Sequence, residues 1–272
     1  MERHSGHGHG QALAAQPHRQ PIERVAVAIV PQVGHGVDQQ APTGGQRAET
    51  FGQGAVEFGG EAFDRMNLEE RTMACVMSME MGAKNALFVS DEAGAETSVS
   101  TVEFEAGSVR PMVAVPSLPT NAVPAEEVEK DMIAVNQAVI ASCAGALLGD
   151  LKTAAGILKG RTVARGTRLI VIPATRKIYN DALALGYIQA LSAAGAIISS
   201  PGCGACGGHD AGILAEGEVC ISSSTRNMPG RMGTGGTVYL GSSATVAASA
   251  ITGYITDPRE LLPCEGGDSV AE

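Results

Sequence analysis

The stretch AVIASCAGALLGDLKTAAGILKGRTVARGTRLIVIP, residues 138–173, decides the fold. Two apolar runs, at 138–142 and 168–173, enclose a segment at 147–159 whose apolar positions recur with helical spacing and which ends at Gly160. Short continuous apolar runs are typical of strands buried on both faces, and a helix between two such strands makes them parallel. The stretch therefore predicts a βαβ unit.

The chain continues in the same pattern. A second helical segment covers 175–194, with Gly186 as a candidate break, and an apolar run at 196–200 leads directly into a turn rich in glycine and cysteine. Parallel sheets bind their ligands outside the carboxyl ends of the strands. Because Cys143 and Cys203 both follow predicted strands, we expect these two thiols at one edge of the sheet.

Two regions upstream give clear local signals. Asn67, followed three residues later by Glu70, has the spacing of a capping box, and apolar positions continue to Gly82, which predicts a helix of about four turns. The segment 108–125 contains four prolines, at positions 111, 116, 119 and 124. They exclude a long helix there and predict extended chain or a linker.

The composition changes near residue 55. Five of the six histidines lie before this point, and the first lysine of the chain is Lys84. An apolar run at 25–30 suits a strand, but the rest of the segment lacks helical or strand periodicity. His4, His7 and His9 could bind a metal, although a flexible tract of histidine and glycine more often has no specific ligand.

These signals predict an α/β fold in three layers, with parallel βαβ units and an irregular N-terminal tail. We expect the tail at 1–54 and a partial α/β region with a linker at 55–125. The α/β domain that carries the cysteines is expected at 126–272.

Composition excludes several classes of protein. The net charge is -10 and the 19 basic residues are scattered, which argues against a nucleic-acid surface. No stretch approaches the roughly 20 apolar residues of a membrane span, and the first residues do not form a secretory signal. Six unevenly spaced cysteines fit a reducing compartment, so we expect a cytoplasmic protein.

Three cysteines stand out as candidate ligands: Cys143, and the pair Cys203 and Cys206. Three thiolates are one short of a closed site, so one metal position would stay open for substrate or water. Zinc is an alternative, since His209 could complete a set of four ligands, and a thioredoxin-like redox pair is another. The surrounding glycines favour an iron-sulfur cluster, because they let backbone N–H groups approach inorganic sulfide.

Two arginines follow within a short segment. Arg226 and Arg231 lie in a loop rich in serine, threonine and asparagine, and guanidinium groups bind carboxylates in bidentate fashion. The alternative is that both are surface arginines that pair with acids such as Glu216 or Glu218. The density of hydrogen-bond donors in the loop favours an anion site.

Five long motifs carry a resemblance to a known family. They are Pro-Gly-Cys-Gly-Ala-Cys-Gly-Gly at 201–208, Gly-Ile-Leu-Ala-Glu-Gly-Glu at 212–218, Ser-Thr-Arg-Asn-Met-Pro-Gly-Arg-Met-Gly at 224–233, Ala-Thr-Val-Ala-Ala-Ser-Ala-Ile at 244–251 and Ile-Thr-Asp-Pro-Arg at 255–259. The chain resembles the aconitase superfamily and, within it, the large subunits of 3-isopropylmalate dehydratase. The resemblance reaches back to about Ala55, roughly four fifths of the chain.

The resemblance implies a hydro-lyase that uses a 4Fe-4S cluster. Cys143, Cys203 and Cys206 would hold the cluster, and its fourth iron would bind the hydroxyl and a carboxylate of a hydroxy acid. Arg226 and Arg231 would bind substrate carboxylate or brace the base, and Glu80 matches an acidic residue near that iron. The implied partner is a small subunit that carries the swivelling domain.

The implied reaction converts 2-isopropylmalate to 3-isopropylmalate by dehydration and rehydration, as in leucine biosynthesis. Homoaconitase or 2,3-dimethylmalate dehydratase would use the same site, and an inactive remnant that only binds metal or a partner is a further alternative. The sequence departs from the family at Cys143-Ala-Gly145, Val76 and Thr225. It has no match to the family's Asp-Ser-His-Thr motif in 1–54, so it looks like a large subunit truncated at its amino terminus.

Overall fold

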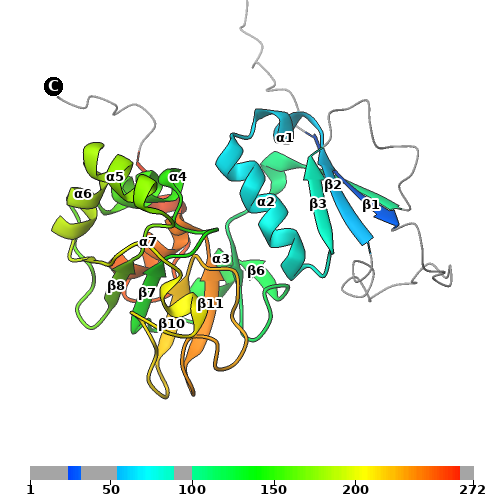
Figure 1. Cartoon of the computed structure of the whole chain (residues 1–272). Helices are drawn as coiled ribbons and strands as arrows, with labels where there is room; N and C mark the ends of the chain where they lie inside the picture. Colours follow the sequence, from blue (N-terminus) through cyan, green and yellow to red (C-terminus); the bar gives the residue numbers. More distant parts are fainter. Residues whose placement is uncertain (1–23, 32–53, 89–99, 264–272) are drawn as a thin grey trace, which may run out of the picture.

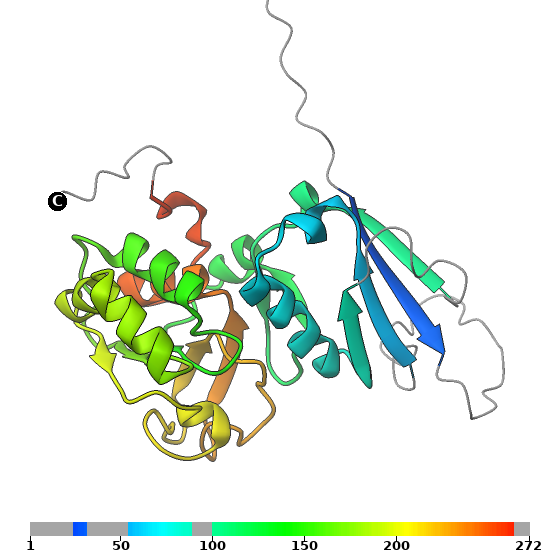
Figure 2. The same cartoon turned by 45° about the horizontal axis from the view of Figure 1, so that its top comes forward.

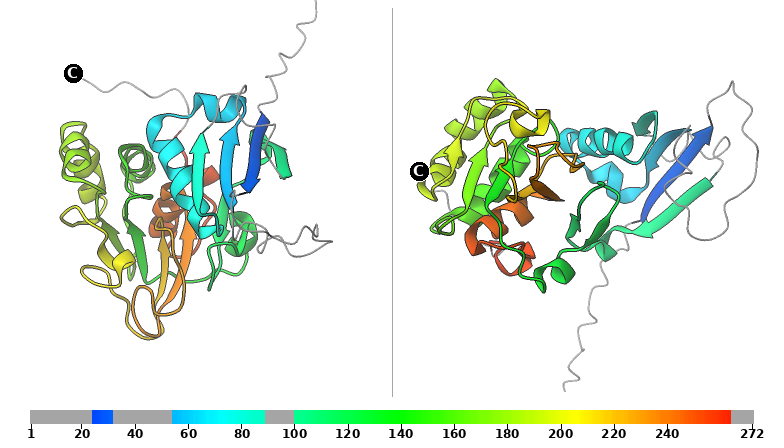
Figure 3. Two further views of the ribbon diagram at one scale, coloured as in Figure 1. Left: turned by 45° about the vertical axis from the view of Figure 1, so that its right-hand side comes forward. Right: turned by 90° about the horizontal axis from the view of Figure 1, so that it is seen from below.

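The computed structural model describes residues 24–31, 54–88 and 100–263, which form two sheets with their helices. Figure 1 shows the smaller sheet, from the first part of the chain, beside the larger sheet, from the second part. Figure 2 shows that α2 lies on the side of the smaller sheet that is turned toward the larger one. Figure 3 shows the same arrangement from two other sides.

The smaller sheet has four strands in the order β3-β2-β1-β4. Its elements are β1 (Arg24–Pro31), β2 (Gly54–Gly59), α1 (Glu61–Arg65), α2 (Leu68–Glu80), β3 (Asn85–Phe88), β4 (Ser100–Glu105) and the 3-10 helix η1 (Ala106–Ser108). The strand predicted at 25–30 is confirmed as β1, which pairs antiparallel with β2 and with β4. The rest of 1–53, with His4, His7 and His9, lies outside the described residues.

Helix α2 begins where its capping box predicts. The side chain of Asn67 accepts the N–H of Glu70 at 3.0 Å, and the carboxylate of Glu70 accepts the N–H of Asn67 at 2.9 Å. Together these bonds satisfy two of the backbone donors that a helix start leaves free. Under the helices, the rings of Phe58, Phe63 and Phe88 pack together with centroids 5.0 to 5.6 Å apart.

The larger sheet has seven strands in the order β6-β5-β11-β10-β7-β8-β9. Its strands are β5 (Met112–Ala114), β6 (Ala122–Pro124), β7 (Gln137–Ile140), β8 (Arg168–Val171), β9 (Ile197–Ile198), β10 (Val219–Ser222) and β11 (Thr237–Gly241). Its helices are α3 (Ala125–Glu129), α4 (Leu148–Leu158), α5 (Arg176–Ala184), α6 (Tyr187–Ala193) and α7 (Ser243–Thr252), with the 3-10 helices η2 (Gly204–Gly207) and η3 (Pro258–Glu260). The strands β7 to β11 are parallel, and β5 and β6 add an antiparallel edge.

The larger sheet is buried on both faces. Ala138 and Ile140 of β7 face the apolar cluster built with α4, α6 and α7, whereas Val139 faces a second cluster that contains Cys206 and Met232. In the part of the chain that the structure describes, loops therefore cover this second face of the larger sheet. Burial on both sides explains why these strands read as continuous apolar runs rather than as alternating ones.

The main sequence predictions for this region are confirmed. The βαβ unit is β7-α4-β8, and Gly186 divides the second helical segment into α5 and α6 by adopting a left-handed conformation with φ 77°. The proline-rich segment is extended, as predicted, and contributes β5 and β6 to the sheet. The α/β fold class is confirmed, and the division of the chain at residues 54 and 125 stays a prediction.

Candidate functional site

The predicted site residues follow the carboxyl ends of parallel strands. Cys143 lies just after β7, Cys203 just after β9 and Arg226 just after β10. The strands β10, β7, β8 and β9 are consecutive neighbours in the sheet and run in the same direction. These residues therefore lie at one edge of the sheet, as the sequence predicts for Cys143 and Cys203.

A buried serine joins the loop of Cys143 to the loop of Arg226. The hydroxyl of Ser223 donates to the carbonyl of Gly145 at 2.6 Å and accepts the N–H of Ala141 at 3.1 Å. Gly145 is necessary at this contact, because a Cβ atom there would lie 1.9 Å from the carbonyl oxygen of Ser223. The two loops therefore hold each other in position on either side of Cys143.

The segment after β8 connects the two cysteine loops. The N–H of Ala174 donates to the carbonyl of Ala146 at 3.1 Å, and the N–H of Gly202 donates to the carbonyl of Pro173 at 3.2 Å. Ala146 belongs to the loop of Cys143, and Gly202 directly precedes Cys203. The segment after β8 therefore holds both cysteine loops in place through these two hydrogen bonds.

The three cysteines fit an iron-sulfur cluster in their chemistry and in their position at one edge of the sheet. Their sulfur atoms do not form a coordinating set: within the described ranges, no three His, Cys, Asp or Glu side chains lie together where they could hold a metal ion. Cys143 and Cys203 are exposed, whereas Cys206 is 7% exposed and belongs to the same apolar cluster as Ala141 and Ile172. Coordination by all three thiols would need their sulfur atoms to lie closer together than they do here.

The remaining thiols and the alternative sites differ from this set. Cys220 is fully buried, and burial raises the pKa of its thiol to about 12, so it stays protonated. Cys264 lies outside the described residues.

The alternative zinc site is not assembled either. His209 is exposed, and in the part of the chain that the structure describes it does not complete a set of ligands with the cysteines. Cys203 and Cys206 are free thiols joined by the short 3-10 helix η2, not by the α-helix of a thioredoxin-like pair.

Arg226 forms an ion pair with a residue of the smaller unit. Its Nε lies 2.7 Å from Oε1 of Glu80, the last residue of α2. Glu80 is 14% exposed, so this pair is partly shielded from water. The alternative in which Arg226 pairs with Glu218 is wrong, because Glu218 pairs instead with Arg168, 2.8 Å away.

Arg231 carries a buried donor without a partner. Its Nε is buried and makes no hydrogen bond among the described residues. Its carbonyl oxygen lies 3.3 Å from the position of a Cβ on Gly208, so it borders the loop of Cys206. A buried N–H of this kind is costly unless it bonds to something, and a ligand carboxylate would satisfy it.

The sequence did not single out one carboxylate at this edge. Glu69, in the first turn of α2, accepts the N–H of Gly149 at 3.1 Å and that of Leu148 at 3.4 Å, at the start of α4. Helix α4 begins just after the loop of Cys143. No local pattern predicts this contact, because the partners lie about 80 residues apart along the chain.

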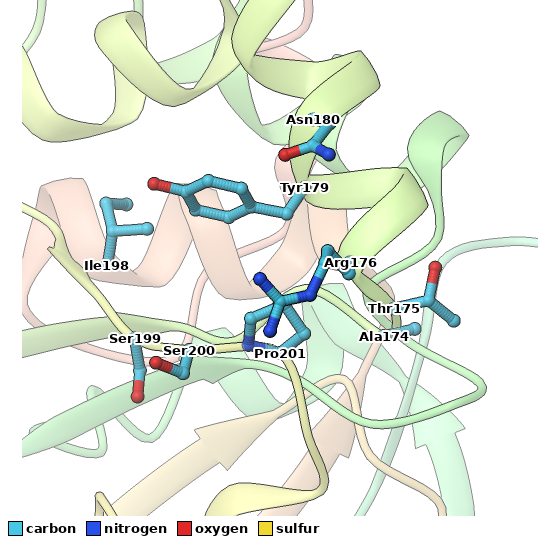
Figure 4. Close-up of a pocket in the computed structure, with 9 residues that line it drawn as sticks. All are labelled: Ala174, Thr175, Arg176, Tyr179, Asn180, Ile198, Ser199, Ser200 and Pro201. Carbon is cyan, nitrogen blue, oxygen red and sulfur yellow. The ribbon is translucent and has the colours of Figure 1, made fainter.

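A polar pocket of about 620 Å³ opens at the same edge (Figure 4). The ring of Tyr179 points from α5 toward Ile198, and Ser199, Ser200 and Pro201 line the opposite side. Arg176 also lines it and forms no ion pair within the described part of the chain. The pocket adds polar groups beside Pro201, two residues before Cys203.

The sequence matches the profile of the Aconitase family (aconitate hydratase) over residues 97–253. It is 40% identical over 233 residues to the 3-isopropylmalate dehydratase large subunit of Aliarcobacter butzleri, an alignment that covers 76% of this chain and 55% of that protein. It is 43% identical over 229 residues to the 3-isopropylmalate dehydratase large subunit 2 of Archaeoglobus fulgidus, covering 76% of this chain and 55% of that protein.

The chain thus spans about half the length of these curated relatives. Among the described residues, every helix is too short or too polar to span a bilayer. The matched region contains Cys143, Cys203, Cys206, Arg226 and Arg231. The chain belongs to the aconitase family.

Proposed function

We propose that this chain belongs to the large subunit of an iron-sulfur hydro-lyase, which isomerises 2-isopropylmalate to 3-isopropylmalate. The observation that carries the proposal is that Arg226, its partner Glu80 and the two cysteine loops lie at one edge of the sheet, where Arg231 borders the loop of Cys206. The names of the relatives support this substrate over homoaconitate or 2,3-dimethylmalate. A small subunit with the swivelling domain would be the partner, since these relatives are named as large subunits.

Cys143, Cys203 and Cys206 would hold a 4Fe-4S cluster through their thiolates. Bound there, the cluster supplies a Lewis-acidic iron that makes a hydroxyl group easier to lose. The exposed thiols of Cys143 and Cys203 are accessible for assembly, and Cys206 would have to come within coordinating distance of them. The glycines around the Cys203 loop give that segment room to change its backbone.

The arginines would bind the carboxylates of the substrate. The buried Nε of Arg231 lacks a partner among the described residues and would gain one. Arg226 holds Glu80 through Nε, which leaves its terminal nitrogens for a carboxylate. Glu80 fixes the direction of that guanidinium. It would be the carboxylate that exchanges a proton with a bound hydroxy acid.

Anaerobic reconstitution of the purified chain, followed by iron and sulfide analysis, tests the proposal. We expect about four irons and four sulfides per chain, with one labile iron. Cys143→Ser, Cys203→Ser and Cys206→Ser should each reduce this content, whereas Cys75→Ser, the same change in α2, should not. Stoichiometric zinc without sulfide, or equal iron content in all four variants, would refute the cluster assignment.

A further inference from the structure

Helix α2 contacts the edge of the larger sheet at both of its ends. Glu69 lies in its first turn and Glu80 is its last residue. Eleven residues make about three turns of an α-helix, so Glu69 and Glu80 lie on the same face of α2, with their Cα atoms about 16 Å apart along its axis. One of them contacts the start of α4 and the other contacts Arg226.

The contact at Glu69 uses both carboxylate oxygens. Oε2 accepts the N–H of Gly149 at 3.1 Å, and Oε1 lies 3.4 Å from the nitrogen of Leu148. The first N–H groups of a helix have no partner within the helix, and a negative charge there also interacts favourably with the helix dipole. Glu69, which belongs to α2, therefore provides the hydrogen-bond acceptor that the first N–H groups of α4 lack within their own helix.

The N–H of Leu147, the residue just before α4, is satisfied by a side chain of the helix itself. The carboxylate of Asp150 accepts the N–H of Leu147 at 3.0 Å. Asp150 thus shapes the first turn of α4 but does not connect it to any other part of the chain through this bond. Glu69 makes that connection, because it belongs to α2 in the smaller unit.

The start of α4 is continuous with the loop of Cys143. Four residues separate Cys143 from Leu148, and within them Gly145 and Ala146 are held by Ser223 and Ala174. The loop is therefore fixed from the larger unit along its length and from the smaller unit at its end. Removing Glu69 would release the contact of that end with the smaller unit, while Asp150 would still bond to Ser243 of α7.

We infer that Glu69 is a positioning residue, which fixes the loop of Cys143 relative to α2 by holding the first N–H groups of α4. The same helix then sets the loop of Cys143 through Glu69 and the direction of Arg226 through Glu80. The positional role stands on the contacts alone, and its value for catalysis rests on the proposed function.

Hydrogen exchange of the 272-residue chain, followed by mass spectrometry, tests this role. In Glu69→Ala, the amides of 147–151 should exchange about tenfold faster, as expected for a lost hydrogen bond to a charged group. Glu69→Gln keeps an acceptor and should restore most of the protection. Glu61→Ala, which removes an exposed carboxylate from the first turn of α1, is the matched control and should change nothing in 147–151.

Thiol alkylation separates positioning from general destabilisation. Cys143 should react several-fold faster with iodoacetamide in Glu69→Ala, while Cys203, an exposed thiol at the same edge, should keep its rate. Equal changes at both thiols, or exchange in 147–151 within twofold of the wild type, would overturn the inference. If Glu69→Ala unfolds, Glu69→Leu, which keeps a side chain of similar size but has no acceptor, decides: a selective increase at Cys143 supports the role and none overturns it. Failure of the wild-type chain to assemble a cluster would refute the proposed function and leave these results standing.

Discussion

The carboxylate of Glu80 and the guanidinium of Arg226 join two parts of the chain that are 146 residues apart, with 2.7 Å between Oε1 and Nε. The bond uses Nε alone. The terminal nitrogens of Arg226 make no hydrogen bond among the residues that the structure describes. Arg226 is therefore oriented by one carboxylate and still able to bind a second one.

This geometry predicts the effect of Arg226→Lys. An ammonium group cannot keep Glu80 and bind a substrate carboxylate through a planar fork, so binding should weaken about tenfold to a hundredfold. The same loss is expected for Arg231→Lys, because the buried Nε disappears. Substrate titration and steady-state kinetics of a complex that turns over, with its visible spectrum unchanged, provide the measurement.

Arg165→Lys is the matched control for both variants. Arg165 is exposed and forms no ion pair within the described ranges, so its replacement should leave substrate binding unchanged. Wild-type kinetics in Arg226→Lys and Arg231→Lys would mean that both residues are surface arginines that do not bind substrate.

Local signals predicted the elements of the fold and not the contacts between them. The capping box of Asn67 and the break at Gly186 depend on residues close in sequence, and both were confirmed. The contact between Glu69 and α4 depends on how two units pack, which no short pattern encodes. The distances between the three thiols depend likewise on how separate loops pack, and among the described residues these thiols do not form a coordinating set.

Gly145→Ala tests the junction between the loops of Cys143 and Arg226. The new Cβ would lie 1.9 Å from the carbonyl oxygen of Ser223, a backbone atom that cannot move without shifting β10. We expect a loss of about 3 kcal/mol in the free energy of unfolding. Urea denaturation measures it.

The control is Gly202→Ala, one residue before Cys203. No heavy atom lies within 4 Å of a Cβ built at Gly202. Its free energy of unfolding should change by about 0.5 kcal/mol or less. A similar loss in both variants would show that the contact with Ser223 is not what makes Gly145 necessary.

Arg259 should make the stability of the larger unit depend on pH. Its hydrogen bond lowers the pKa of Glu126; burial alone would raise the pKa of Asp257, but the hydrogen bonds from Arg259 lower it. Carboxyl groups with a lowered folded pKa add stability above their unfolded pKa, about 4, and lose it as the pH falls through the folded value. Arg259→Met should therefore destabilise the protein more at pH 7 than at pH 3.

Urea denaturation at the two pH values measures this difference. Arg165→Met, which removes an exposed arginine that forms no ion pair in the described part of the chain, should show no such dependence. An equal loss for Arg259→Met at pH 7 and pH 3 would mean that the two carboxyl groups titrate alike in the folded and unfolded states.

The 272-residue chain by itself should show negligible hydratase activity. It spans 55% of its relative from Aliarcobacter butzleri, and residues 1–54 contain no match to the Asp-Ser-His-Thr motif that the family resemblance leads one to expect. Proton transfer in the reaction needs a positioned acid or base, which typically contributes a factor of about 10² to 10⁴. Adding only the small subunit of a relative should not restore turnover. Turnover by the reconstituted chain, measured by the absorbance of the unsaturated intermediate, would contradict this, and Glu80→Gln would then show whether Glu80 is the group that transfers the proton.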